Sequence, residues 1–155
     1  MKYKVFVTVG TTAFEGLVSA SDELAEANPS LDFRFQISDG KVVPQNGRYF
    51  RFVDNIDVHY RQADVVITHS GAGSIYQLLE LGKKIIIVPN FERVDKHQSD
   101  IAFFMEQNGY ALVCWDVQNL ETLIDTSKTF EVKEFSKTNF FKYDEIVSYI
   151  TESVK

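Results

Sequence analysis

The sequence predicts an α/β fold in which a doubly wound, mostly parallel, Rossmann-like sheet carries helices on both faces. Two apolar runs, "DVVITHS" at residues 64–70 and "KIIIVPN" at residues 84–90, are typical of strands buried on both sides of a parallel sheet. A helical segment separates them, and strands and helices alternate along all 155 residues. A chain of this length is expected to form one domain, residues 1–155.

The other expected elements follow from hydrophobic periodicity and from residues that start or stop helices. Asn55 is expected to cap a short helix, and the Asn108-Gly109 pair is expected to end a longer one. Further strands are expected at residues 3–10, 32–38, 48–53 and 110–115. Helices are expected at residues 14–27, 55–63, 74–82, 97–107, from 119, and in the last stretch, 140–155.

Composition excludes several classes of function. The net charge is −6 and the 16 basic residues are scattered, so we expect no nucleic-acid partner. The three histidines lack the spacing of a zinc site, so no metal is expected. The single Cys114 lies in the apolar run "ALVCW", which favours a buried core thiol over a reactive one. No apolar run approaches the roughly 20 residues needed to span a bilayer, so membrane association would need a partner.

Ligands of such folds bind outside the carboxyl ends of the strands, where three loops are of interest. The first is Gly10-Thr11-Thr12, which can present backbone N–H groups and two hydroxyls to an anion. The sequence supports equally well a turn at Gly10 with a threonine that caps the next helix. Both interpretations stay open.

The second loop, residues 70–74, follows the strand that ends near His69. Gly71 and Gly73 let the backbone approach a ligand closely, and Ser74 can cap the following helix or bind a phosphate. His69 is either a donor to that phosphate or a structural residue. Neither GxGxxG nor GxxxxGK[ST] is present, which argues against a dinucleotide dehydrogenase and an ATPase.

The third loop contains Asp95, His97 and Gln98. Gln98 offers a donor and an acceptor, which suits sugar hydroxyls. The alternative, which the residues alone favour, is that Asp95 caps the following helix and the other two residues are solvated surface.

Four segments in this order resemble the donor-binding, C-terminal half of GT-B glycosyltransferases of the family 28 type. They are "VTVGTTAFEGL", "FVDNIDVHYRQADVVITHSGAGSI", "LGKKIIIVPN" and "DKHQSDIA". The sequence is most similar to the small catalytic subunits of two-component transferases, such as PssE-type exopolysaccharide subunits and the dolichol-linked GlcNAc transferase subunit. The resemblance implies inverting transfer from a UDP-sugar, with no cofactor and no required metal.

The resemblance also implies roles for individual residues. It places the uracil ring near the backbone of Phe52 and Val53 and the donor sugar near Asp95, His97 and Gln98. The diphosphate would be held by Gly10, Thr11, Thr12, His69, Gly71, Gly73 and Ser74.

Two positions depart from the family pattern. Many members carry a glutamate eight residues after the loop histidine, where it binds both ribose hydroxyls, and here that residue is Gln77. Because a charged acceptor forms the stronger hydrogen bond, we expect weaker donor binding or a replacement contact from Glu80. Lys84 stands where proline is common.

One such half does not make a complete GT-B enzyme. The resemblance therefore implies a membrane-anchored partner that resembles the missing N-terminal half and supplies the lipid-linked acceptor site and the catalytic base. The chain is expected in the cytoplasm, at the inner face of the membrane through that partner. Gln77 favours an alternative, a noncatalytic nucleotide-sugar-binding or stabilising subunit. A distant third interpretation is half of a nucleotide-sugar epimerase.

Overall fold

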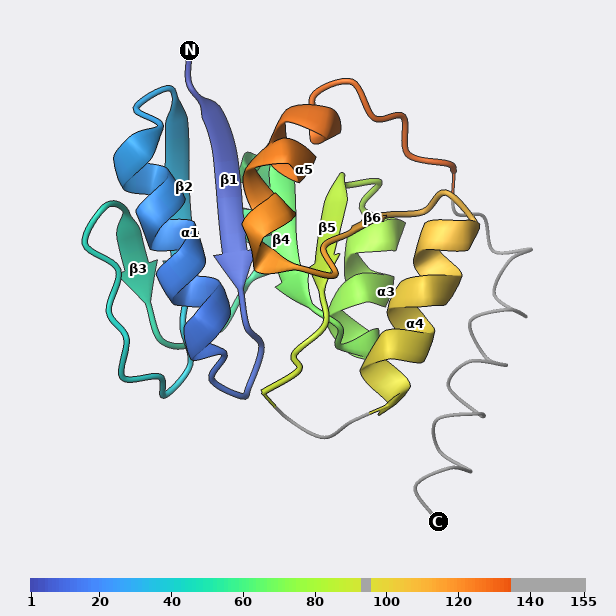
Figure 1. The fold of residues 1–155 in the computed structure, drawn as a ribbon, viewed down its shortest axis with the longest axis horizontal. Coiled ribbons are helices and arrows are strands. Elements are labelled where there is room, and N and C mark those ends of the chain that lie inside the picture. The colour runs from blue at the N-terminus through green and yellow to red at the C-terminus, as the bar shows by residue number, and fades with distance from the viewer. Residues whose placement is uncertain (93–95, 135–155) are drawn as a thin grey trace.

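The computed structural model describes residues 1–92 and 96–134. Within these residues, six parallel strands form one sheet in the order β3-β2-β1-β4-β5-β6, so the chain winds outward from β1 in both directions (Figure 1). This topology confirms the predicted α/β, Rossmann-like fold. The strands are β1 (Tyr3–Thr8), β2 (Leu31–Gln36), β3 (Arg48–Phe50), β4 (Val65–His69), β5 (Ile85–Val88) and β6 (Leu112–Val113).

The helices cover the sheet from both sides (Figure 1). One buried cluster joins α1 (Glu15–Ala27) and α5 (Leu120–Ser127) to the sheet, and α5 follows a short 3₁₀ turn, Val117–Asn119. A second cluster on the opposite face joins α2 (Asp57–Gln62), α3 (Ala72–Glu80) and α4 (Lys96–Gln107). The central strands β4 and β5 are buried on both sides, as their apolar runs predict.

Several predicted boundaries differ from the observed ones. Asn55 as a cap is wrong, because Ile56 precedes α2 and no side chain caps that helix. Gly109 is confirmed as the end signal of α4, with φ of +71°. The predicted helix at 140–155 lies outside the described residues. None of the helices that the structure describes is long and apolar enough to cross a bilayer.

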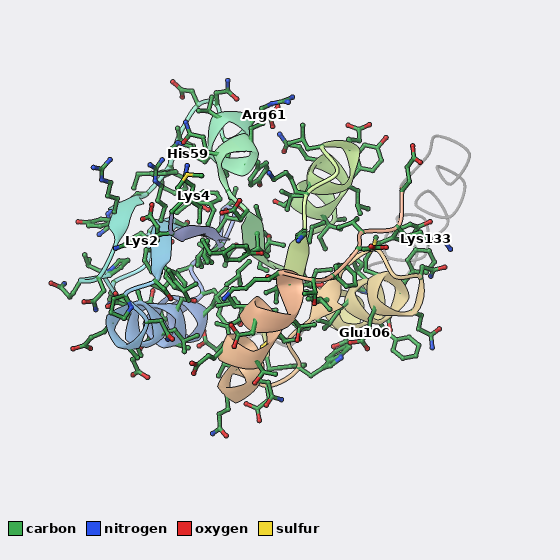
Figure 2. All side chains as sticks on the ribbon, turned by 90° about the horizontal axis from the view of Figure 1, so that it is seen from above. Lys2, Lys4, His59, Arg61, Glu106 and Lys133 are labelled. Atoms are coloured by element: carbon green, nitrogen blue, oxygen red, sulfur yellow. The ribbon has the colours of Figure 1, made fainter. Side chains whose placement is uncertain are left out.

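The ring of His59 packs over Phe50 and Phe6, with centroid distances of 4.5 and 5.5 Å. Figure 2 shows His59 beside Lys4, and both line a small cavity with Arg34. Burial and the charge of Arg34 lower the pKa of His59, so this imidazole is uncharged at neutral pH.

Candidate functional site

The loops that follow β1, β4 and β5 leave the same edge of the sheet. β4 pairs with β1 on one side and with β5 on the other, all parallel, so these three loops are neighbours. They are the three loops that the sequence singles out. Their common edge is where ligands bind in open parallel sheets.

The first and second loops meet around the ring of His69. A Cβ added to Gly10 would lie 2.6 Å from Cε1 of His69, and one added to Gly71 would lie 2.2 Å from its Nε2. Both distances are shorter than real contacts, so each glycine is required to make room for the imidazole. Gly10 also has φ of +72°, which side chains other than glycine adopt at a cost. The ring is therefore enclosed between two loop backbones.

Gly73 differs from these two glycines because its added Cβ would meet nothing within 4 Å. It lies in the first turn of α3, where backbone N–H groups point out of the helix end. Gly71 therefore makes room for His69, and Gly73 is the glycine that faces open space. Of the two, only Gly73 leaves room for a ligand against the backbone.

The hydroxyl of Ser74 forms a hydrogen bond with the phenol of Tyr60, which is buried in α2. Burial raises the pKa of Tyr60, so this phenol is un-ionised at neutral pH. Ser74 thus ties α3 to α2 and is not the cap residue of α3, since Gly71 holds that position. A phosphate bound here would share Ser74 with Tyr60.

Thr11 and Thr12 are exposed at the mouth of the first loop. The alternative that one of them caps the next helix is wrong, because α1 begins at Glu15 after Phe14 and has no side-chain cap. The main-chain oxygen of Thr11 accepts a hydrogen bond from Ser38 Oγ at 3.0 Å. The loop is held by its backbone, and both threonine side chains remain accessible to a ligand.

Gln36, which sequence reasoning missed, organises this loop from the end of β2. Its buried Oε1 accepts hydrogen bonds from Thr8 Oγ1, Val9 N and Gly10 N at 2.6, 3.1 and 3.0 Å. Its Nε2 donates to the main-chain oxygens of Gly10 and Arg51, both at 2.8 Å. One side chain therefore joins the first loop to the segment that precedes Phe52. The signal in the sequence was an uncharged amide at a strand end next to the loop.

His69 is uncharged at neutral pH, because burial lowers its pKa more than a hydrogen bond to the Thr8 backbone raises it. Thr68 Oγ1 lies 3.3 Å from its Nδ1. A neutral imidazole carries one N–H, and the hydrogen bond to the Thr8 backbone uses it, so the other ring nitrogen is an acceptor. The ring is packed as a structural residue and lies where the two loops meet. Its predicted role as a donor to phosphate stays a prediction.

The third loop is tied to the second through Gln98. The Oε1 of Gln98 accepts from Asn90 N at 2.9 Å, and its main-chain oxygen accepts from Ser70 Oγ at 2.5 Å. One acceptor lone pair of this amide is therefore taken, and its NH₂ group is a hydrogen-bond donor. His97 is half-buried in α4, and Asp95 lies outside the described residues.

The remaining predicted residues lie on α2, α3 and the segment before α2. Phe52 and Val53 are 62% and 40% exposed after β3, and an exposed aromatic ring there is free to contact a base. Gln77 donates a hydrogen bond from Nε2 to the Asp57 carboxylate. Glu80 is exposed at the last position of α3, the end away from Gly73, so the structure brings Asp57 rather than Glu80 to Gln77.

An apolar cleft of about 480 Å³ opens beside the third loop. It is lined by Phe14 at the start of α1, by Pro89 and Phe91 after β5, and by Trp115 and Val117 after β6. Phe91 is 64% and Trp115 is 39% exposed.

Cys114 lies at the base of the same cleft. Its side chain is buried and burial raises its pKa to about 11, which confirms the predicted core thiol. Within residues 1–92 and 96–134, no three His, Cys, Asp or Glu side chains come together as a metal site would require.

Comparison with known proteins decides the family. Residues 4–150 match the Glycosyltransferase family 28 C-terminal domain. The chain belongs to this family. Human UDP-N-acetylglucosamine transferase subunit ALG13 is 37% identical over 123 residues, an alignment that covers 71% of this chain and 11% of the human protein.

A bacterial transferase is also similar to this chain. The Finegoldia magna UDP-N-acetylglucosamine--N-acetylmuramyl-(pentapeptide) pyrophosphoryl-undecaprenol N-acetylglucosamine transferase is 30% identical over 137 residues, which cover 80% of this chain and 37% of that protein. The solution structure of ALG13 superimposes with a TM-score of 0.61 at 23% identity and covers 86% of this chain and 89% of that one. This chain spans well under two thirds of the curated human and F. magna relatives.

Proposed function

We propose that this chain is the donor-binding, catalytic subunit of a two-component, inverting glycosyltransferase that takes its sugar from a UDP-sugar. The observation that carries the proposal is the convergence of two glycine loops around neutral His69, with Gly73 open beside them. Backbone N–H groups at such a place suit a diphosphate. The relatives named above are UDP-N-acetylglucosamine and N-acetylglucosamine transferases.

The proposed reaction needs little chemistry from this half. An acceptor hydroxyl attacks the anomeric carbon, the bond to the β-phosphate oxygen breaks, and UDP leaves with the charge on its diphosphate. N–H groups in the Gly10 loop and at the start of α3 stabilise that charge, as preorganised donors do in other transferases. We assign the base that takes the hydroxyl proton to the partner, because His69 is enclosed and its lowered pKa makes it a weak base.

The apolar cleft supports the need for a partner. A groove with Phe91 and Trp115 exposed on its walls is unusual on a surface that remains in water. It opens on the same edge as the proposed donor site, the edge that a second Rossmann-like half and its acceptor would face. The aromatic segment at residues 139–150, for which the sequence supports docking and core packing equally, lies outside the described residues.

We assign this partner as a membrane-anchored protein that resembles the missing N-terminal half and presents a lipid-linked acceptor. The complex would act at the cytoplasmic face of the membrane in exopolysaccharide or capsule synthesis. The genes next to this one are the place to look for a protein with one N-terminal membrane helix.

Two measurements test the proposal. Titration calorimetry with UDP should give saturable binding with a dissociation constant in the millimolar range or below. ADP should bind more weakly, because its nucleobase is adenine rather than uracil. Radiolabelled sugar should pass from the UDP-sugar to a lipid fraction only when chain and partner are co-expressed. Absence of UDP binding would contradict the proposed donor site. Sugar transfer by the partner alone would contradict the catalytic role of this chain.

A noncatalytic nucleotide-sugar-binding subunit is the second candidate, because Gln77 replaces the usual glutamate. This candidate predicts UDP binding together with partner-only transfer. The same co-expression assay therefore separates the two functions.

A further inference from the structure

The Asp57 carboxylate and the Gln77 amide form a polar pair that joins α2 to α3. Both side chains are half-buried, so the pair is neither a solvated surface contact nor sealed in the core. Ser74 and Tyr60 make a second link between the same helices. These two links together fix the position of the Asp57 carboxylate relative to the loop before α3.

The position of the pair suits one part of a nucleotide. Asp57 begins α2 directly after the segment that contains Phe52 and Val53, the proposed neighbours of the base. Gln77 lies one turn after Ser74, within α3, the helix that follows the proposed diphosphate loop. In a nucleoside diphosphate the ribose lies between the base and the diphosphate. The pair joins the two elements that would hold those outer parts.

The chemistry of the pair also suits the ribose. A carboxylate accepts several hydrogen bonds, and the amide of Gln77 uses one of those acceptor positions on Asp57. The remaining positions can accept from vicinal hydroxyls as charge-assisted bonds, which a glutamine alone cannot offer. Gln77, whose NH₂ group holds the carboxylate, keeps its own carbonyl as a second, neutral acceptor.

We infer that Asp57 binds the ribose hydroxyls of the donor nucleotide and that Gln77 positions it. This inference rests on the proposed function, because it names the residue that reads the sugar of the proposed nucleotide. The carboxylate that residue 77 lacks is thus supplied from α2. Gln77 therefore does not weaken binding of the donor nucleotide.

The first test compares UDP with its 2′-deoxy analogue by titration calorimetry. Wild-type protein should prefer UDP by roughly tenfold, the effect of one charge-assisted hydrogen bond. Asp57→Asn should lose most of that preference. Asp54→Asn removes the same charge from an exposed position three residues earlier and should keep it. Thermal unfolding of each variant shows whether the fold is retained.

An exchange of the two groups tests the positioning role. Gln77→Glu alone places a second carboxylate against Asp57, and the repulsion should lower UDP affinity roughly tenfold. Adding Asp57→Asn to Gln77→Glu restores one carboxylate and one amide with their places exchanged. The double variant should recover both the affinity and the preference for UDP over its 2′-deoxy analogue. A purely structural pair would restore stability without restoring that preference.

The outcomes separate this inference from the proposed function. If the wild-type protein binds UDP and Asp57→Asn keeps the full preference, the role of Asp57 is overturned and the donor site stands. If the exchange variant stays as weak as Gln77→Glu, the positioning role of Gln77 is overturned. If the wild-type protein binds no uridine nucleotide, both the proposed function and this inference fail.

Discussion

The two parts of the carboxyl edge are built differently. Around β1 and β4, polar groups are paired closely: the side chain of Gln36 makes five hydrogen bonds, and His69 fills the space between two glycines. Beside β5 and β6, the edge opens into a cleft whose walls expose Phe91 and Trp115. The contrast agrees with the proposed function, in which one part binds a small polar ligand and the other contacts apolar groups of a partner.

The largest expected effect is that of Gly10→Ala. The new Cβ would lie 2.6 Å from His69, and φ of +72° is unfavourable for alanine, so we expect a loss of roughly 2–4 kcal/mol in unfolding free energy and no UDP binding. Urea denaturation and calorimetry measure both quantities.

Gly73→Ala is the matched control for the loss of stability, because the Cβ added at Gly73 meets nothing within 4 Å. It should keep or raise stability, since alanine is favoured over glycine in helices, and should still weaken UDP binding. Unchanged UDP affinity in Gly73→Ala would argue against a ligand at the start of α3.

Gln36→Ala should have the next largest effect. It leaves buried partners such as Thr8 Oγ1 and Gly10 N without their acceptor, which should cost roughly 2–3 kcal/mol in unfolding free energy and weaken UDP binding. Gln118→Ala, at an exposed amide, is the control and should change neither. Equal stability of the two variants would show that the loop holds its shape without Gln36.

A smaller and more selective effect is expected for Phe91→Ser in the cleft. It should weaken binding of the partner about tenfold, as loss of an aromatic contact at an interface does, and leave UDP binding unchanged.

The fluorescence of Trp115 measures this binding. Trp115 is the only tryptophan of the chain and lies in the cleft, so its fluorescence should shift to shorter wavelength when the partner binds. Phe103→Ser, at an aromatic residue of α4 that is 53% exposed, is the control. Equal loss in both variants would exclude the cleft as the docking surface.

The smallest effect is the dependence of stability on pH through His69. Its folded-state pKa is below the ordinary value of 6.5, so its contribution to stability is present above 6.5 and is lost as pH falls through the lowered pKa. His59 has a pKa shift in the same direction. Between about pH 7.5 and about pH 5, wild-type protein should lose more unfolding free energy than His69→Gln. Equal losses would show that His69 does not titrate with unfolding.

The sequence predicts much of this fold because its apolar residues form clear local patterns, either continuous runs or regular periods. The two central strands and the end of α4 at Gly109 follow from local patterns. Caps were less predictable, because Asn55 and the threonines of the first loop have the right chemistry but lie before the positions where the helices begin.

The site was predictable only in part, for a related reason. The glycines and His69 could be found as a motif, but Gln36 acts on a loop 26 residues earlier in the chain. Asp57 meets Gln77 across 20 residues. Such pairings depend on how strands and helices pack together, and no local period encodes them.

The enclosure of His69 also restricts the order in which this site can change. Gly71 can accept a side chain only after the ring at residue 69 has been shortened, because the two compete for the same space. His69→Ala should therefore make Gly71→Ala tolerable, and the two substitutions together should cost less than the sum of their separate effects. We therefore expect His69 and Gly71 to change together in evolution, because a side chain at residue 71 is tolerated only after His69 has been replaced by a smaller residue.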